Sequence, residues 1–384
     1  MSERKLKAWE AAGLIDGDTA ARIRQWEDEH ARPLALWAVF GIAALAIGLG
    51  VLSVVAANWD DIPGIVRLSL HFALMAGLAA FLWLRASSLA ERQPWLHEAA
   101  LFILGALGLT FMGHVGQVYQ TSSPLWQPLA LWLVLFGPLL LLHGLSWLTA
   151  ATIAVTLVFT GWNYAIEANG GYGEEFSETI RTVRASLAVS VAILLAGLGA
   201  AQRRRSARQA FWITIERLGL TYALGLASLA IVVCAFETFT KHDDAGTIFL
   251  GLATGALVAS LSALAVWRAR PARTGEAVAG VLLGAALAVL LGFVLSGSQL
   301  AAGVLFMALW TGVAFAALHA GSRGVFQVAV GVVAVRLIVL SFELASDLLF
   351  SGVGLIVSGL LVLGIAFAAV RVSKTFAPVT GEPA

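Results

Sequence analysis

Long apolar stretches, separated by short polar turns, follow one another from Leu34 almost to the end of the chain. Each stretch is close to the roughly 20 residues that an α-helix needs to cross the hydrocarbon core of a bilayer. Backbone groups cannot be left unpaired in lipid, so stretches of this kind must be helices. The pattern predicts an all-α, polytopic bundle of about twelve transmembrane helices, at residues 34–57, 65–84, 97–118, 125–143, 146–165, 183–200, 218–238, 246–267, 276–296, 300–319, 324–344 and 349–370. Two short polar breaks, near His143-Gly144 and near Gly297, decide this count.

The polar segment at residues 1–33 has a different pattern. Leu6 and Trp9 lie three residues apart, which gives the first part of the segment one apolar stripe at helical spacing. Gly13 suits the end of that helix, and Asp16 suits the N-cap of a second one. We expect two short helices on the cytosolic side, which either pack on themselves or on the membrane surface, or dock a cytosolic protein.

Composition supports a membrane protein. Only 12% of the residues are charged and 59% are hydrophobic, whereas ordinary soluble domains carry about 25% charged residues. The formal net charge of +1 gives no indication of a nucleic-acid partner. Cys234 is the single cysteine, so the chain cannot form an internal disulfide.

Lysine and arginine gather in alternate loops of the predicted bundle. If the N-terminus is cytoplasmic, most of the 24 basic residues face the cytoplasm, while acidic turns such as Asp60-Asp61 lie on the opposite side. The positive-inside rule describes this asymmetry, so both termini are predicted to be cytoplasmic. The basic run Arg203–Arg205, in a loop predicted to be cytoplasmic, is a candidate contact for anionic lipid headgroups.

This orientation divides the chain into five segments. They are a cytosolic two-helix segment at 1–33, membrane helices one to six at 34–201, a basic cytoplasmic loop at 202–217, membrane helices seven to twelve at 218–370, and a cytoplasmic tail at 371–384. Two pairs of glycines four residues apart, Gly251 with Gly255 and Gly280 with Gly284, allow close contact between helices.

Three short motifs resemble a known family. They are Trp9-Glu10-Ala11-Ala12-Gly13-Leu14-Ile15-Asp16, then Ala56-Ala57-Asn58-Trp59-Asp60-Asp61-Ile62-Pro63 with Arg67-Leu68, and Gly116-Gln117-Val118-Tyr119-Gln120. Over about residues 1–145 the chain is similar to the bacterial membrane family catalogued as domain of unknown function 2157. The resemblance implies a multi-pass protein of the bacterial inner (cytoplasmic) membrane. It implies no reaction.

Ten polar or charged residues lie in or beside the predicted spans, toward their outer halves. They are Asn58, Asp60, Arg67, His71, His114, Gln117, Tyr119, Gln120, Arg336 and Glu343. Charged groups inside a bilayer are costly and therefore suggest function. Arg336 and Glu343 are seven residues apart and share one stripe of their helix. We expect these ten residues to line an outward-facing polar cavity that binds substrate, with Arg336 as its deepest charge.

Several of these residues also have a structural interpretation. Arg67 can reach the membrane interface along its own side chain, and Asp60 can belong to a solvated turn. His71 and His114 can join neighbouring helices by hydrogen bonds. Arg336 can pair with Glu343 for structural reasons alone.

Three classes of function follow. The signatures of hydrolases, zinc enzymes and nucleotide-binding loops are missing, so we predict no catalytic residues, no cofactor and no metal. Transport, or the handling of a lipid or small molecule, is the first hypothesis. The alternative is a non-enzymatic scaffold that binds a partner through residues 1–33. A membrane transferase that uses His114 or Asp60 as a base is the least favoured class.

Overall fold

The computed structural model describes residues 6, 9–30, 61–170, 176–238, 244–344 and 352–376, with isolated positions between 39 and 46. These residues are helical or lie in turns and loops, with no strand among them, which confirms the all-α prediction. The chain forms two compact units, residues 1–67 and 68–384. Each unit is described separately below.

The N-terminal unit contains the predicted pair of short helices. Residues 9–11 are helical, and α2 spans Gly17–His30. Gly13 adopts a positive φ of 67°, and the Leu14 N–H donates to the Trp9 carbonyl at 2.9 Å. This bond ends the first helix as glycine-terminated helices usually end. The predicted span 34–57 and the turn at Asn58–Asp60 fall almost wholly outside the described residues.

Asp16 caps α2, as the sequence predicts. Its Oδ1 accepts a hydrogen bond of 2.9 Å from the Thr19 N–H. Hydrogen bonds from the Thr19 side chain and backbone hold the pKa of the Asp16 carboxyl below its ordinary value. A lowered folded-state pKa means that the ionised cap stabilises α2 above the unfolded pKa of about 3.9 and loses this effect as the pH falls through the lowered value.

We therefore expect Asp16→Ala to reduce the protection of the α2 amides against hydrogen exchange at pH 6, because the Thr19 N–H loses its acceptor. Asp16→Asn should keep that protection, since an amide oxygen also caps helices. It should also remove the fall in protection that we expect in the native chain as the pH drops below about 4, after correction for intrinsic exchange. Unchanged protection in Asp16→Ala would contradict the capping role.

The second unit is a succession of long helices. The helices are α4 (Gly64–Arg92, which begins in the first unit), α5 (Pro94–Tyr119), α6 (Trp126–His143), α7 (Trp147–Asn169), α8 (Glu178–Ser190), the 3₁₀ turn η1 (Val191–Ile193), α9 (Leu194–Gln202), α10 (Gln209–Phe236), α11 (Ala245–Ala269), α12 (Ala272–Val294), α13 (Gln299–His319), α14 (Arg323–Leu344) and α15 (Gly352–Phe376). Within the described residues, ten helices are long and apolar enough to cross a membrane, with α8, η1 and α9 counted as one. α15 adds a shorter apolar stretch at Gly359–Val372.

These helices match the predicted spans from residue 65 onward. The two breaks that decided the count are both present, because α6 ends at His143 and α13 begins at Gln299. The largest difference concerns α10, which begins at Gln209 although its span was predicted from residue 218. Arg217, placed in a loop by the sequence pattern, therefore lies inside this helix.

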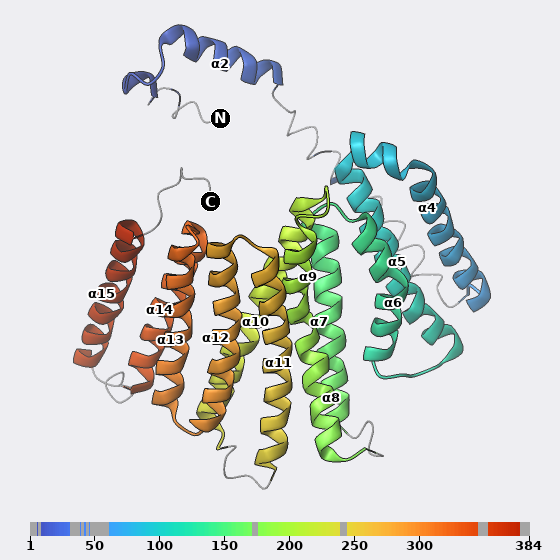
Figure 1. Ribbon diagram of the computed structural model, residues 1–384. Helices are drawn as coiled ribbons and strands as arrows, with labels where there is room; N and C mark the ends of the chain where they lie inside the picture. The colour runs from blue at the N-terminus through green and yellow to red at the C-terminus, as the bar shows by residue number, and fades with distance from the viewer. Residues whose placement is uncertain are drawn as a thin grey trace. The chain divides into compact units, whose positions relative to one another are not determined.

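Successive helices of the second unit pack side by side. α11 packs against α12, α12 against α13, and α13 against α14, while α10 contacts α7, α9, α12 and α13 (Figure 1). Glycine permits the closest approach: a Cβ on Gly219 would collide with the α9 backbone at Ala196. The core between α9, α10, α11 and α12 consists largely of alanine, with leucine and valine.

The close contact that the glycine pairs allow is formed at one of the two pairs. Gly251 and Gly255 meet Ser186 and Ser190 of α8, so α8 and α11 approach closely there. Apart from the adjacent residues and the backbone of α12 itself, no described atom lies within 4 Å of a Cβ placed on Gly280 or Gly284. The second pair instead lines a groove along α12 and α13.

Candidate functional site

A cavity of about 280 Å³, the central cavity, lies between α7, α8, α10, α11 and α12. Most of its wall is made of alanine, glycine, leucine and valine, and none of the lining side chains is charged. Polar groups come from Asn169 at the end of α7 and from Thr182, Ser186 and Ser190 of α8. Each of the three α8 residues follows the previous one by four positions, so they form one stripe along the helix.

The serines of this stripe are available to a ligand. Neither Ser186 nor Ser190 makes a hydrogen bond through its hydroxyl to any described residue. Ser190 is nevertheless buried, at 3% exposure. Buried hydroxyls normally find a partner, so these side chains give the cavity an unused capacity to bind a polar group.

The helix that carries the stripe is interrupted beside the cavity. Val191–Ile193 forms a 3₁₀ turn between α8 and α9. The hydroxyl of Tyr222 donates to the Val189 carbonyl at 2.8 Å. The hydroxyl of Ser262 donates to the Ile193 carbonyl at 2.9 Å and accepts from the Gly197 N–H at 3.0 Å. Side chains of α10 and α11 thus satisfy backbone groups at the interruption, as a break within a membrane helix requires.

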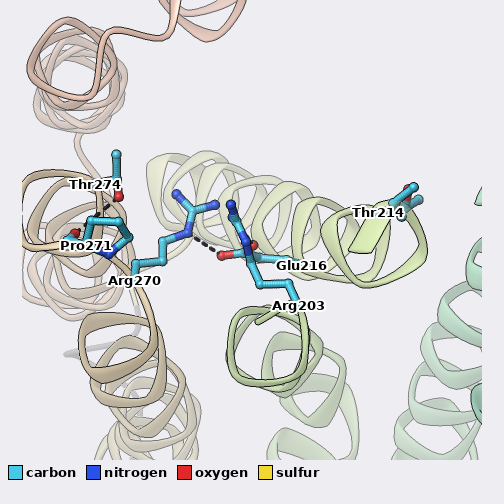
Figure 2. Close-up of polar contacts among 7 residues, drawn as sticks. Arg203, Thr214, Glu216, Arg270, Pro271 and Thr274 are labelled. Atoms are coloured by element: carbon cyan, nitrogen blue, oxygen red, sulfur yellow. Dashed lines mark hydrogen bonds and ion pairs between the residues drawn. The ribbon is translucent and has the colours of Figure 1, made fainter. Parts of the chain in front are cut away.

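A buried ion cluster joins three elements near the ends of α9 and α11. The Glu216 side chain is fully buried in α10. Its carboxylate accepts from Arg203 at 3.1 Å and from Arg270 at 2.7 Å. Figure 2 shows both guanidinium groups directed at this carboxylate. Because the two cations follow α9 and α11 in the chain, the cluster ties both helix ends to α10.

A second buried carboxylate, Glu98 of α5, holds the turn between α6 and α7. It accepts hydrogen bonds from the Ser146 N–H at 2.9 Å and the Ser146 hydroxyl at 2.8 Å, and also from the Leu145 N–H. The Thr149 hydroxyl donates to it at 3.0 Å. Glu98 therefore satisfies donors at the start of α7 that have no partner within that helix.

Arg208, which directly precedes α10, contacts the same turn between α6 and α7. Its guanidinium donates to the Gly144 carbonyl at 2.7 Å and to the Leu141 carbonyl at 3.0 Å. Burial lowers the pKa of Arg208, and the nearby charge of Glu98 acts in the opposite direction. The two buried carboxylates, Glu98 and Glu216, thus bind groups at helix ends and in the turn between α6 and α7.

Of the ten residues predicted for a site, the structure brings His71 and His114 together. Their Nδ1 atoms are 3.2 Å apart, and His71 Nε2 lies 3.0 Å from the Leu107 carbonyl. If His71 carries its proton on Nε2, it donates to that carbonyl and accepts from His114 through Nδ1. This geometry fits the structural interpretation, a hydrogen bond between α4 and α5.

The other predicted residues differ in how far the structure describes them. Gln117, Tyr119 and Gln120 are exposed at the end of α5, and Gln120 caps the helix with a φ of 52°. Arg67 lies in the part of α4 that belongs to the first unit. Asn58 and Asp60, and the side chain of Glu343, lie outside what the structure describes.

Arg336 occupies a different place. Its guanidinium lies over the Phe306 ring, with 6.0 Å between Cζ and the ring centroid, beside a small cavity of about 50 Å³. α14 packs against α13 and α15, whereas α5 packs against α6 and α7. Arg336 is therefore not brought to the histidine pair, and none of the predicted residues that the structure describes lines the central cavity.

Comparison with known proteins confirms the resemblance. The family described as "Predicted membrane protein (DUF2157)" matches residues 7–149. No curated protein and no solved structure matches the chain. The matched region includes Glu98 and the turn that it holds, whereas the residues around the central cavity lie beyond it.

Proposed function

We propose that the protein binds a small uncharged molecule in the cavity between α7, α8, α10, α11 and α12 and moves it across the membrane. The observation that carries this proposal is the cavity with unused hydroxyls beside an interrupted helix. Interrupted helices near the middle of the bilayer form the binding sites of many transporters. A mid-helix 3₁₀ stretch is also a common hinge.

The chemistry of the wall defines the substrate class. A charged ligand would lose its hydration in a cavity with no opposite charge to replace it, which is strongly unfavourable. The volume of about 280 Å³ is close to the lower end of ordinary ligand sites, at roughly 300 Å³. A small molecule with an apolar body and one or two hydrogen-bonding groups fits these limits, with Ser186 and Ser190 as its polar partners.

The direction of opening follows from the predicted orientation. Asn169 and Thr182 lie at the ends of α7 and α8 that precede and follow one loop. With cytoplasmic termini, that loop faces away from the cytoplasm. The proposed site in the inner membrane is therefore entered from the outer side, and a bend at Val191–Ile193 would change its access.

Filling the cavity provides the test. Ala256 lines the cavity on α11, whereas its neighbour Leu257 is 60% exposed and does not. We expect the gently purified chain to retain an uncharged small molecule at about one per chain, identified by mass spectrometry. Ala256→Phe should lower its retention at least about tenfold, because the ring occupies the binding volume. Leu257→Phe should retain it.

Two further measurements separate loss of binding from loss of folding. The thermal unfolding midpoint of Ala256→Phe in detergent should stay near that of Leu257→Phe. The double variant Ser186→Ala, Ser190→Ala should weaken retention without filling the cavity. Equal retention in all variants would contradict the proposed site.

A scaffold function is the second candidate, and exposed apolar side chains of the N-terminal unit favour it. Leu14 is 71% exposed and Trp9 is 38% exposed. Single exposed apolar residues are common, but two on one short hairpin offer a contact for a partner protein. A protein that co-purifies in stoichiometric amount, and is lost on deletion of residues 1–32, would support this function in place of transport.

A further inference from the structure

A basic pocket of about 340 Å³ opens between the C-terminal ends of α9 and α11. Arg204 and Arg205 border it from the turn that follows α9, and Arg268 borders it from α11. Its floor is formed by Ala201, Ala265 and Ala269. All three arginines are exposed, and none has an acidic or other polar partner among the described residues.

The surrounding arginines are already occupied. Arg203 and Arg270 bind the buried carboxylate of Glu216, and Arg208 donates to two backbone carbonyls. The connection that bears Arg204 and Arg205 is thereby anchored at both ends. The sequence suggested Arg203–Arg205 as one basic run, but the structure divides it, because Arg203 faces the protein interior and its two neighbours border the pocket.

Apolar side chains continue from the pocket along both helices. On α11, exposed Leu261 and Leu264 lie about two turns and one turn before Arg268. On α9, exposed Leu194 and Leu198 precede Ala201 at helical spacing. Each helix thus carries an apolar stripe that leads to an arginine at its end.

We infer that this pocket binds the phosphate of an anionic phospholipid, with the acyl chains along the two leucine stripes. Arginine suits this role because its planar guanidinium can donate two parallel hydrogen bonds to phosphate. An amphiphile with a negative head and apolar chains matches both the three cations and the stripes, whereas free phosphate would use only the cations. The site is separate from the central cavity and does not depend on the proposed transport.

The test uses the full chain in neutral detergent, titrated with fluorescent phosphatidylglycerol and, as the uncharged comparison, phosphatidylcholine. The native chain should bind phosphatidylglycerol more tightly. The triple variant Arg204→Gln, Arg205→Gln, Arg268→Gln should bind it about 100-fold more weakly, as expected for three lost arginine contacts at a membrane surface.

A matched variant separates a specific site from general attraction. Arg273, Arg323 and Arg371 are also exposed, lie on the side predicted to be cytoplasmic, and do not border this pocket. Their triple replacement by glutamine removes the same charge and should leave binding close to the native value. Equal losses in both triple variants would overturn the inference, as would native binding in the first.

Two additional measurements address a variant that does not fold and the source of the phosphate group. If the first triple variant does not fold, Arg268→Gln alone applies the same criterion, with an expected loss of about fivefold. Competition with inorganic phosphate distinguishes the source of the phosphate group. Phosphate that binds as tightly as phosphatidylglycerol would overturn the assignment to a lipid, and failure to displace the lipid would support it.

Discussion

Replacing Glu216 by alanine should lower the free energy of unfolding by about 3–5 kcal/mol, the range measured when one partner of a buried ion pair is removed. The carboxylate is fully buried, and Arg203 and Arg270 both bind it. Without it, two cations face one another and α10 loses its links to the ends of α9 and α11. Equilibrium unfolding in detergent micelles would measure the change.

The adjacent Arg217 gives a matched control, because it is exposed and makes no ion pair with a described residue. Arg217→Ala should change the stability little. The double variant Arg203→Ala, Arg270→Ala should be at least as unstable as Glu216→Ala, since it leaves a buried carboxylate without a cation. Replacing all three residues by apolar ones should recover part of the loss. Native stability in Glu216→Ala would contradict the role of the cluster.

Replacing Glu98 by alanine should cost about 3 kcal/mol or more, because several buried donors lose their acceptor together. Each buried donor left without a partner costs about 1–3 kcal/mol. The donors include the N–H groups of Leu145 and Ser146 and the Thr149 hydroxyl. The damage should be local at first, so amide exchange at the start of α7 should accelerate more than exchange in α12.

Two comparisons give this prediction its specificity. Glu98→Gln should lose less stability than Glu98→Ala, because the amide oxygen still accepts hydrogen bonds. Glu91→Ala removes a carboxylate from an exposed position at the end of α4 and should have a small effect. Equal stability of Glu98→Ala and Glu91→Ala would exclude the proposed role of Glu98.

Much of the fold could be predicted because the bilayer leaves few alternatives. A stretch of about 20 apolar residues in lipid must form a helix, so the spans from residue 65 onward follow from hydropathy alone. Helix ends are less constrained, since the chain can continue as a helix beyond the apolar stretch. This is why α10 begins at Gln209, and why Glu216 was assigned to a loop although it is the centre of a buried cluster.

The central cavity could not be predicted from hydropathy. Its wall combines small residues from five helices, and each of them alone resembles ordinary helix packing. The available signal was the stripe of Thr182, Ser186 and Ser190, opposite Gly251 and Gly255. The charged residues were more conspicuous, but charge alone does not show which helices are neighbours. Pairing of Arg336 with Glu343 stays a prediction.

The ion cluster around Glu216 also orders the assembly of the protein in time. Arg203 precedes Glu216 by one short connection, so it leaves the ribosome before the carboxylate that it binds. Arg270 follows only after the whole of α11 has been made. When α10 enters the membrane, Glu216 therefore has one nearby cation, and the second arrives one helix later. Both oxygens of the buried carboxylate can hold an arginine only after α11 has been made, so the complete cluster forms late in biogenesis.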